Sequence, residues 1–125
     1  MNVRSIAGWI LAILLALVFL GSGLAKLTSQ AMPVGMFALF GLPPWFMYLT
    51  GALEVVTAVL VLVPRTSGIG AALVVCIMIG ATIAHATHGQ ISMIGATIVI
   101  AILAVVLGNL RGWPRGTAPL ASVAR

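Results

Sequence analysis

The chain has 125 residues, of which 62% are hydrophobic and only 6% are charged. Such a chain cannot cover a soluble domain with charged side chains, so the composition excludes that class and predicts an integral membrane protein in contact with the lipid bilayer. The formal charge of +5 does not indicate nucleic-acid binding, because the six cations are spread along the chain rather than clustered.

Four apolar stretches are long enough to cross the roughly 30 Å core of a bilayer as helices. We assign these spans to residues 6–27, 46–63, 68–86 and 91–110. Pro43, Pro44 and Pro64 bound the second span because proline cannot continue a helix, and Gly89 separates the third span from the fourth. The joints on both sides of the third span are about four residues long, so they predict antiparallel neighbours. The predicted fold class is all-α, a transmembrane four-helix bundle forming one domain over residues 1–110.

The cations predict the orientation of this bundle. Five of the six lie on the side of the two termini, namely Arg4, Arg65, Arg111, Arg115 and Arg125. Because cations favour the cytoplasmic side, both termini are predicted to be cytoplasmic, with Lys26 at the outer face. The first span is too long for a signal-peptide core and has no A-x-A site before Lys26, so we expect it to be retained. Glycine and proline in residues 111–125 predict a flexible cytoplasmic tail.

The longest connection, residues 28–45, lies on the outer side in this topology and is unusually apolar. Met32, Phe37, Phe40 and their neighbours predict that it lies on the membrane surface or folds over the mouth of the bundle, and a short helix is compatible with its composition. Pro33 and Gly41 are expected to interrupt it. A lid and an interfacial anchor are both open interpretations.

Glu54 is the only acidic residue, and it lies inside the second span. An ionised carboxylate at this depth costs about 2.5 to 3.5 kcal/mol on insertion scales, so it needs a partner, a proton or a function. At 1.5 Å per residue, Glu54 lies about 12 Å below the outer end of its helix. Lys26 ends the first span and His85 ends the third, both on the outer side. We therefore expect these three side chains to gather in the outer half of the bundle.

Helical spacing adds polar neighbours to this candidate site. Hydroxyl side chains share helix faces with the three ionisable residues and are predicted to line a pocket: Ser22, Thr50, Thr57 and Thr82. On the fourth span, Thr97, Ala101, Ala104 and Gly108 form a stripe of small residues suited to close helix packing.

Two interpretations of Glu54 remain open. It forms a buried ion pair with Lys26 that fixes the helix register, or it belongs to a site for a proton or for a polar ligand head group, such as a quinone carbonyl. A metal site is not expected, because His85, His88 and Glu54 are the only good ligands, and His85 and His88 share a face only if the helix continues through Gly89. Cys76 is the sole cysteine, which excludes an intrachain disulfide, and we expect its thiol to lie in the core.

Three segments resemble the DoxX family of small four-helix membrane proteins. Residues 19–27 end in Lys26 and Leu27, residues 51–54 end in Glu54, and residues 80–85 end in His85. The resemblance covers residues from about 5 to 110. It implies a four-helix protein of a bacterial inner membrane, in a family that includes subunits tied to quinone-linked sulfur oxidation and proteins assisting the assembly or redox maturation of partners. It does not imply one activity, since fold alone does not determine function.

Together these features lead to a functional hypothesis. The chain is expected to be an accessory or small subunit of a membrane redox system, not a catalyst on its own, with a redox protein as partner and a quinone as candidate ligand near Lys26, Glu54 and His85. No covalently bound cofactor is expected. The main alternative is an assembly or scaffold protein, and a less favoured one is a small transporter or proton channel, because the inner half offers only Thr57 as a polar side chain on the Glu54 face. Oligomer formation is left open.

Overall fold

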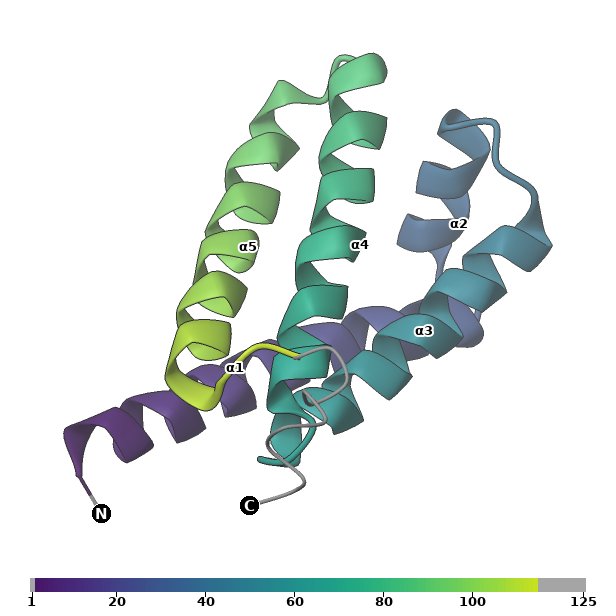
Figure 1. Cartoon of the computed structure of the whole chain (residues 1–125). Helices are drawn as coiled ribbons and strands as arrows, with labels where there is room; N and C mark the ends of the chain where they lie inside the picture. The colour runs from purple at the N-terminus through teal and green to yellow at the C-terminus, as the bar shows by residue number, and fades with distance from the viewer. Residues whose placement is uncertain (1, 115–125) are drawn as a thin grey trace, which may run out of the picture.

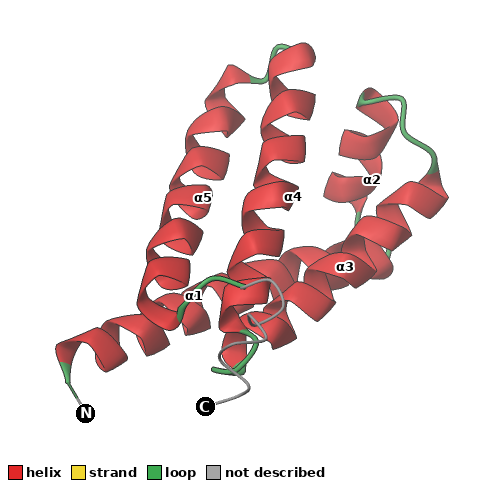
Figure 2. Cartoon of the chain, viewed as in Figure 1, coloured by secondary structure: helices red, strands yellow, loops and turns green. Residues whose placement is uncertain are grey.

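The computed structural model describes residues 2–114, which form five helices and contain no strand. These are α1 (Val3–Leu27), α2 (Ala31–Leu39), α3 (Pro44–Leu62), α4 (Ser67–Thr87) and α5 (Ile91–Arg111). Four of them are long and apolar enough to cross a membrane, and only α2 is too short (Figures 1 and 2). The predicted all-α class and the four spans are confirmed.

Local sequence signals explain where the helices begin and end. Asn2 caps α1, because its side-chain oxygen accepts a hydrogen bond of 2.8 Å from the backbone N–H of Ser5. Pro44 occupies the first position of α3, where a helix does not need its missing N–H. Gly41 and Gly89 have φ angles of +70° and +72° in the turns after α2 and α4, a conformation that glycine adopts without steric cost.

The long helices are arranged as two antiparallel pairs, α1 with α3 and α4 with α5, which cross at a wide angle (Figure 1). The predicted packing of α3 against α4 is therefore only partly correct. The two helices do touch, but less extensively than the helices within each pair. At their joint, a methyl group built on Gly70 would lie 2.7 Å from the backbone nitrogen of Val61, which shows how closely the chain approaches itself there.

Glycine at two positions allows α1 and α3 to approach closely. A methyl group at Gly51 would lie 2.9 Å from the backbone oxygen of Gly23, and one at Gly23 would lie 2.7 Å from the oxygen of Gly51. Small residues of this kind drive helix association in membranes, where packing replaces the hydrophobic effect. This contact, which a short joint cannot reveal, explains why α1 and not α4 is the main partner of α3.

The core lies where the two pairs cross, and all four long helices contribute to it. Its members are mostly small or β-branched residues and leucine: Ala12, Leu15, Ala16, Phe19, Ala58, Val61, Ala71, Val74, Met78, Ala104 and Leu107. The expected small-residue stripe of α5 is largely buried, since Thr97, Ala104 and Gly108 all lie in the interior. Gly108 faces the ring of Trp113, which leaves no space for a methyl group at this position.

Three expectations need correction. Cys76 is exposed on the outer surface of α4 and not in the core, because an apolar run does not reveal which of its residues face lipid. Pro33 does not interrupt the 28–45 connection, since it lies in the first turn of α2, where proline is tolerated. Arg111 belongs to α5 and not to a flexible tail. Residues 115–125 of the predicted tail lie outside the described part of the chain.

We expect Gly51→Ala to lower the free energy of unfolding by about 1 to 3 kcal/mol, because the added methyl group must push α1 and α3 apart. Thermal unfolding of the purified protein in a mild detergent measures this change. Gly21→Ala is the matched control, since a methyl group there would meet nothing within 4 Å. Alanine favours helix over glycine, so the control should be neutral or slightly stabilised. Equal destabilisation by both substitutions would contradict the proposed importance of the glycine contact.

Candidate functional site

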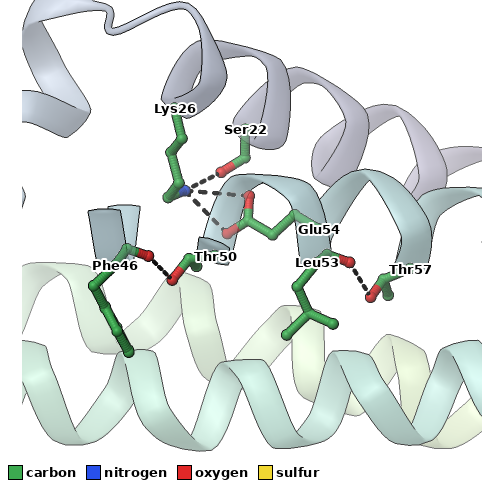
Figure 3. Close-up of polar contacts among 7 residues, drawn as sticks. All are labelled: Ser22, Lys26, Phe46, Thr50, Leu53, Glu54 and Thr57. Carbon is green, nitrogen blue, oxygen red and sulfur yellow. Dashed lines mark hydrogen bonds and ion pairs between the residues drawn. The ribbon is translucent and has the colours of Figure 1, made fainter. Parts of the chain in front are cut away.

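Lys26 of α1 and Glu54 of α3 form an ion pair between the two helices of the first pair (Figure 3). The Lys26 Nζ lies 3.0 Å from Oε1 and 3.2 Å from Oε2 of Glu54. The same nitrogen donates a hydrogen bond of 2.7 Å to the hydroxyl oxygen of Ser22, one turn earlier on α1. Lys26, Glu54 and Ser22 therefore lie together, as helical spacing predicts.

The pair is shielded from the surroundings, with 13% of the Lys26 side chain and 6% of the Glu54 side chain exposed. The Lys26 ammonium donates hydrogen bonds to Ser22 and to Oε2 of Glu54, and Oε1 lies within ion-pair distance. Two opposite charges removed from water require such pairing, because each alone carries a large desolvation cost. The arrangement is therefore well suited to fixing α1 against α3.

The predicted threonines do not point their hydroxyl groups into a shared pocket. Each donates a hydrogen bond to a backbone carbonyl of its own helix: Thr50 to Phe46 at 2.8 Å, Thr57 to Leu53 at 2.7 Å and Thr82 to Met78 at 2.7 Å. Figure 3 shows the first two bonds beside the ion pair. A hydroxyl one turn from a free helical carbonyl commonly bonds it, which satisfies the group inside an apolar environment.

Thr82 has a second partner that the sequence did not reveal. Its hydroxyl oxygen lies 2.7 Å from that of Thr97, so α4 and α5 share a polar contact. The small-residue pattern of α5 predicted Thr97 at a helix interface but did not predict that its hydroxyl group contacts that of Thr82. This bond links the helices of the second pair as the ion pair links those of the first.

His85 belongs to a different cluster from Lys26 and Glu54. It is 8% exposed, and its Nδ1 lies 2.7 Å from Oε1 of Gln90 in the turn between α4 and α5. Within residues 2–114, no hydrogen bond or ion pair joins His85 to Lys26 or Glu54. Sequence reasoning missed Gln90, although a polar residue five positions after a helix-end histidine was an available signal.

The second nitrogen of His85 remains available for another contact. Because the amide oxygen of Gln90 can only accept, Nδ1 carries the hydrogen in this arrangement and Nε2 has a lone pair. The described residues contain no fully buried side-chain nitrogen or oxygen that lacks a partner, so Nε2 reaches the molecular surface. Nε2 can accept a hydrogen bond, or donate one after protonation.

Phe40, directly after α2, covers the end of α4. Its ring centre lies 5.5 Å from that of His85, in an edge-on arrangement, and 4.8 Å from that of His88. The connection is also tied to α3, since the hydroxyl oxygens of Ser29 and Tyr48 are 2.6 Å apart. The 28–45 connection therefore contacts both helix pairs at this end of the molecule. His88 itself is exposed, as expected.

Two shallow grooves run along the outer surface of the helix pairs. The larger, about 410 Å³, lies between α4 and α5 and includes Thr82, and the smaller, about 150 Å³, lies between α1 and α3. Lys26, Glu54 and His85 line neither groove. Among residues 2–114 there is also no group of three or more residues that could hold a metal ion.

Comparison with known proteins agrees with this architecture. The model of the DoxX-like family matches residues 10–107, which is more than half of the chain. The chain belongs to the DoxX-like family. Its four apolar helices identify it as a multi-pass membrane protein of that family. No curated protein and no solved structure matches the chain.

Glu54→Gln is expected to lower the free energy of unfolding by about 3 to 5 kcal/mol, because it leaves the Lys26 ammonium unpaired in an apolar environment. Lys26→Met should act similarly by leaving the carboxylate without its cation. The double variant retains neither charge, so its loss of stability should be clearly smaller than the sum of the two single losses. Unfolding in mixed detergent micelles measures all three.

The control for this cycle is Arg65→Gln, which removes an exposed cation from the turn between α3 and α4. It should change the free energy of unfolding by no more than about 0.5 kcal/mol. Strictly additive effects of the two single substitutions would contradict an energetic coupling between Lys26 and Glu54.

Proposed function

We propose that this DoxX-like protein is a small accessory subunit of a membrane redox system in a bacterial inner membrane, and that it receives the polar head of a lipophilic ligand such as a quinone at the His85 end of α4. The observation that carries the proposal is the environment of His85. Its ring is oriented by Gln90 and covered by Phe40, while Nε2 stays accessible. A fixed imidazole next to aromatic and apolar side chains is a common way to orient a carbonyl or hydroxyl group.

In this proposal the ion pair stabilises the helix pair that lies next to the one carrying His85. Lys26 and Glu54 satisfy one another, so in this proposal they hold α1 against α3 and do not contact the ligand directly. His85 takes the role of the residue that bonds the ligand and exchanges protons with the outer aqueous phase. The roles of the three candidate residues thus differ from those expected from the sequence.

The 28–45 connection acts as a lid in this proposal. Phe40 lies against both histidines, so in this proposal its ring borders the path by which a ligand approaches His85. Helix α2 has nine residues and is joined to α1 and α3 by short turns, and in this proposal it moves as a unit.

A second candidate function is that of a scaffold protein for a partner membrane complex. The observation that supports it is the pairing of Lys26 with Glu54 and Ser22, which agrees with a purely architectural role for these charges. A transporter or proton channel has less support, because Thr57 is fully buried and its hydroxyl group bonds its own helix.

Quinone retention tests the ligand proposal. The tagged full-length protein is purified from bacterial membranes in mild detergent, and the quinone in its lipid extract is quantified by chromatography. His85→Phe preserves an aromatic ring beside Phe40 but removes Nε2. Loss of one ligand hydrogen bond should reduce the retained quinone by about tenfold.

His88→Phe serves as the matched control, since His88 is exposed and lies against the same phenylalanine. It should retain wild-type amounts of quinone. Proteins that co-purify are identified in the same samples. Absence of quinone from the wild-type sample would defeat the ligand proposal. If Glu54→Gln then reduced the yield of a partner while all samples lacked quinone, the scaffold function would be favoured.

A further inference from the structure

Positive charge at the end where α1 begins and α5 ends has no acidic side chain to balance it. Arg4, Arg65 and Arg111 all lie at this end. The only acidic residue of the whole chain is Glu54, and Lys26 already pairs with it. An anion that balances these arginines must therefore come from outside the folded helices.

Arg111 is held in a fixed position and is half-buried. Its Nη1 donates a hydrogen bond of 3.2 Å to the hydroxyl oxygen of Ser67, the first residue of α4. That hydroxyl group gives its own hydrogen to the carbonyl oxygen of Val61 at 2.6 Å, so it can accept from the arginine. The Arg111 guanidinium carbon also lies 4.8 Å from the ring centre of Trp9, a cation–π contact that fixes its plane.

Arg4 contacts the same turn of α5. Its Nη2 donates a hydrogen bond of 3.0 Å to the backbone oxygen of Asn109, two residues before Arg111. Arg111 packs against Gly8, where a methyl group would lie 2.9 Å from its Nε. Arg4 and Gly8 are four residues apart and share one face of α1. Both guanidinium groups thus lie at the junction between the first turns of α1 and the last turn of α5.

We propose that Arg4 and Arg111 bind the phosphate group of one anionic phospholipid. For each arginine, the protein contacts described above engage one terminal nitrogen, and the other N–H groups remain to bond an anion. The planar guanidinium fork matches two phosphate oxygens at once, and two such forks fixed at one junction form a site of defined geometry.

The surroundings favour a lipid over a soluble phosphate. Val3, Ile6 and Ile10 of α1 are 82%, 45% and 54% exposed, and they continue from the arginines along the apolar length of the helix. A phospholipid can place its phosphate on the guanidinium groups and its acyl chains along these residues. The ring of Trp9 contacts the Arg111 guanidinium, and an indole ring is favoured at the membrane interface.

Native mass spectrometry of the delipidated full chain in a neutral detergent tests this site. Three probes are titrated: dioctanoyl phosphatidylglycerol, dioctanoyl phosphatidylcholine and inorganic phosphate. We expect one phosphatidylglycerol to bind per chain, with the other two clearly weaker. Arg4→Gln/Arg111→Gln should weaken phosphatidylglycerol binding about tenfold or more, since each arginine at an anionic lipid contributes several-fold.

Arg65→Gln is the matched control, because it removes the same charge from the same end but lies in the turn between α3 and α4. It should change the affinity by no more than about twofold. Arg111→Lys tests the site with the fold and the charge preserved, and circular dichroism should show unchanged helix content. Phosphatidylglycerol binding should still weaken, because lysine lacks the planar fork. Equal weakening by Arg65→Gln would show unspecific charge attraction and overturn the site. Inorganic phosphate binding as tightly as phosphatidylglycerol would overturn the assignment to a lipid.

Discussion

The buried contact between Lys26 and Glu54 is the constraint on which the first helix pair depends. Two charges in an apolar setting allow few alternatives, because a slip of one helix along the other would leave both unpaired. Gly23 and Gly51 bring the helices close enough for the contact to form. The pair therefore specifies register, while the glycines set the distance. Neither feature alone would define how α1 lies on α3.

The second helix pair uses weaker polar contacts and is joined to the first mainly through the small-residue core. The bond between Thr82 and Thr97 and the bond between His85 and Gln90 both link α4 to α5 or to the turn between them. Phe40 then connects the 28–45 segment to this pair. The end of the molecule where α1 and α4 end thus contains the ion pair of Lys26 and Glu54 and, separately, the imidazole of His85 bonded to Gln90.

The sequence was informative where single residues have strong physical preferences. Apolar length, proline and Gly89 defined the spans to within a few residues, and the cost of burying Glu54 correctly pointed to Lys26 as its neighbour. Packing between helices was harder to predict, because it depends on helix rotation and on which small residues meet. For that reason the main partner of α3, the exposed position of Cys76 and the bond of His85 to Gln90 could not be predicted from spacing. In the sequence, Arg4 and Arg111 served only to predict the orientation of the bundle. The structure shows that both lie where α1 begins and α5 ends.

The unequal lengths of the helices bear on how the protein fits its membrane. Helix α1 has 25 residues and α3 has 19, which correspond to about 37 Å and 28 Å along their axes. A hydrocarbon layer of about 30 Å matches α3 but is too thin for an upright α1. Because the two helix pairs cross at a wide angle, they cannot both stand along the bilayer normal. Because α1 and α3 form one antiparallel pair, a tilt that shortens the projection of α1 also shortens that of α3. The two helices therefore cannot both match the layer in length, so either the helix ends extend beyond the hydrocarbon core or the bilayer changes its local thickness.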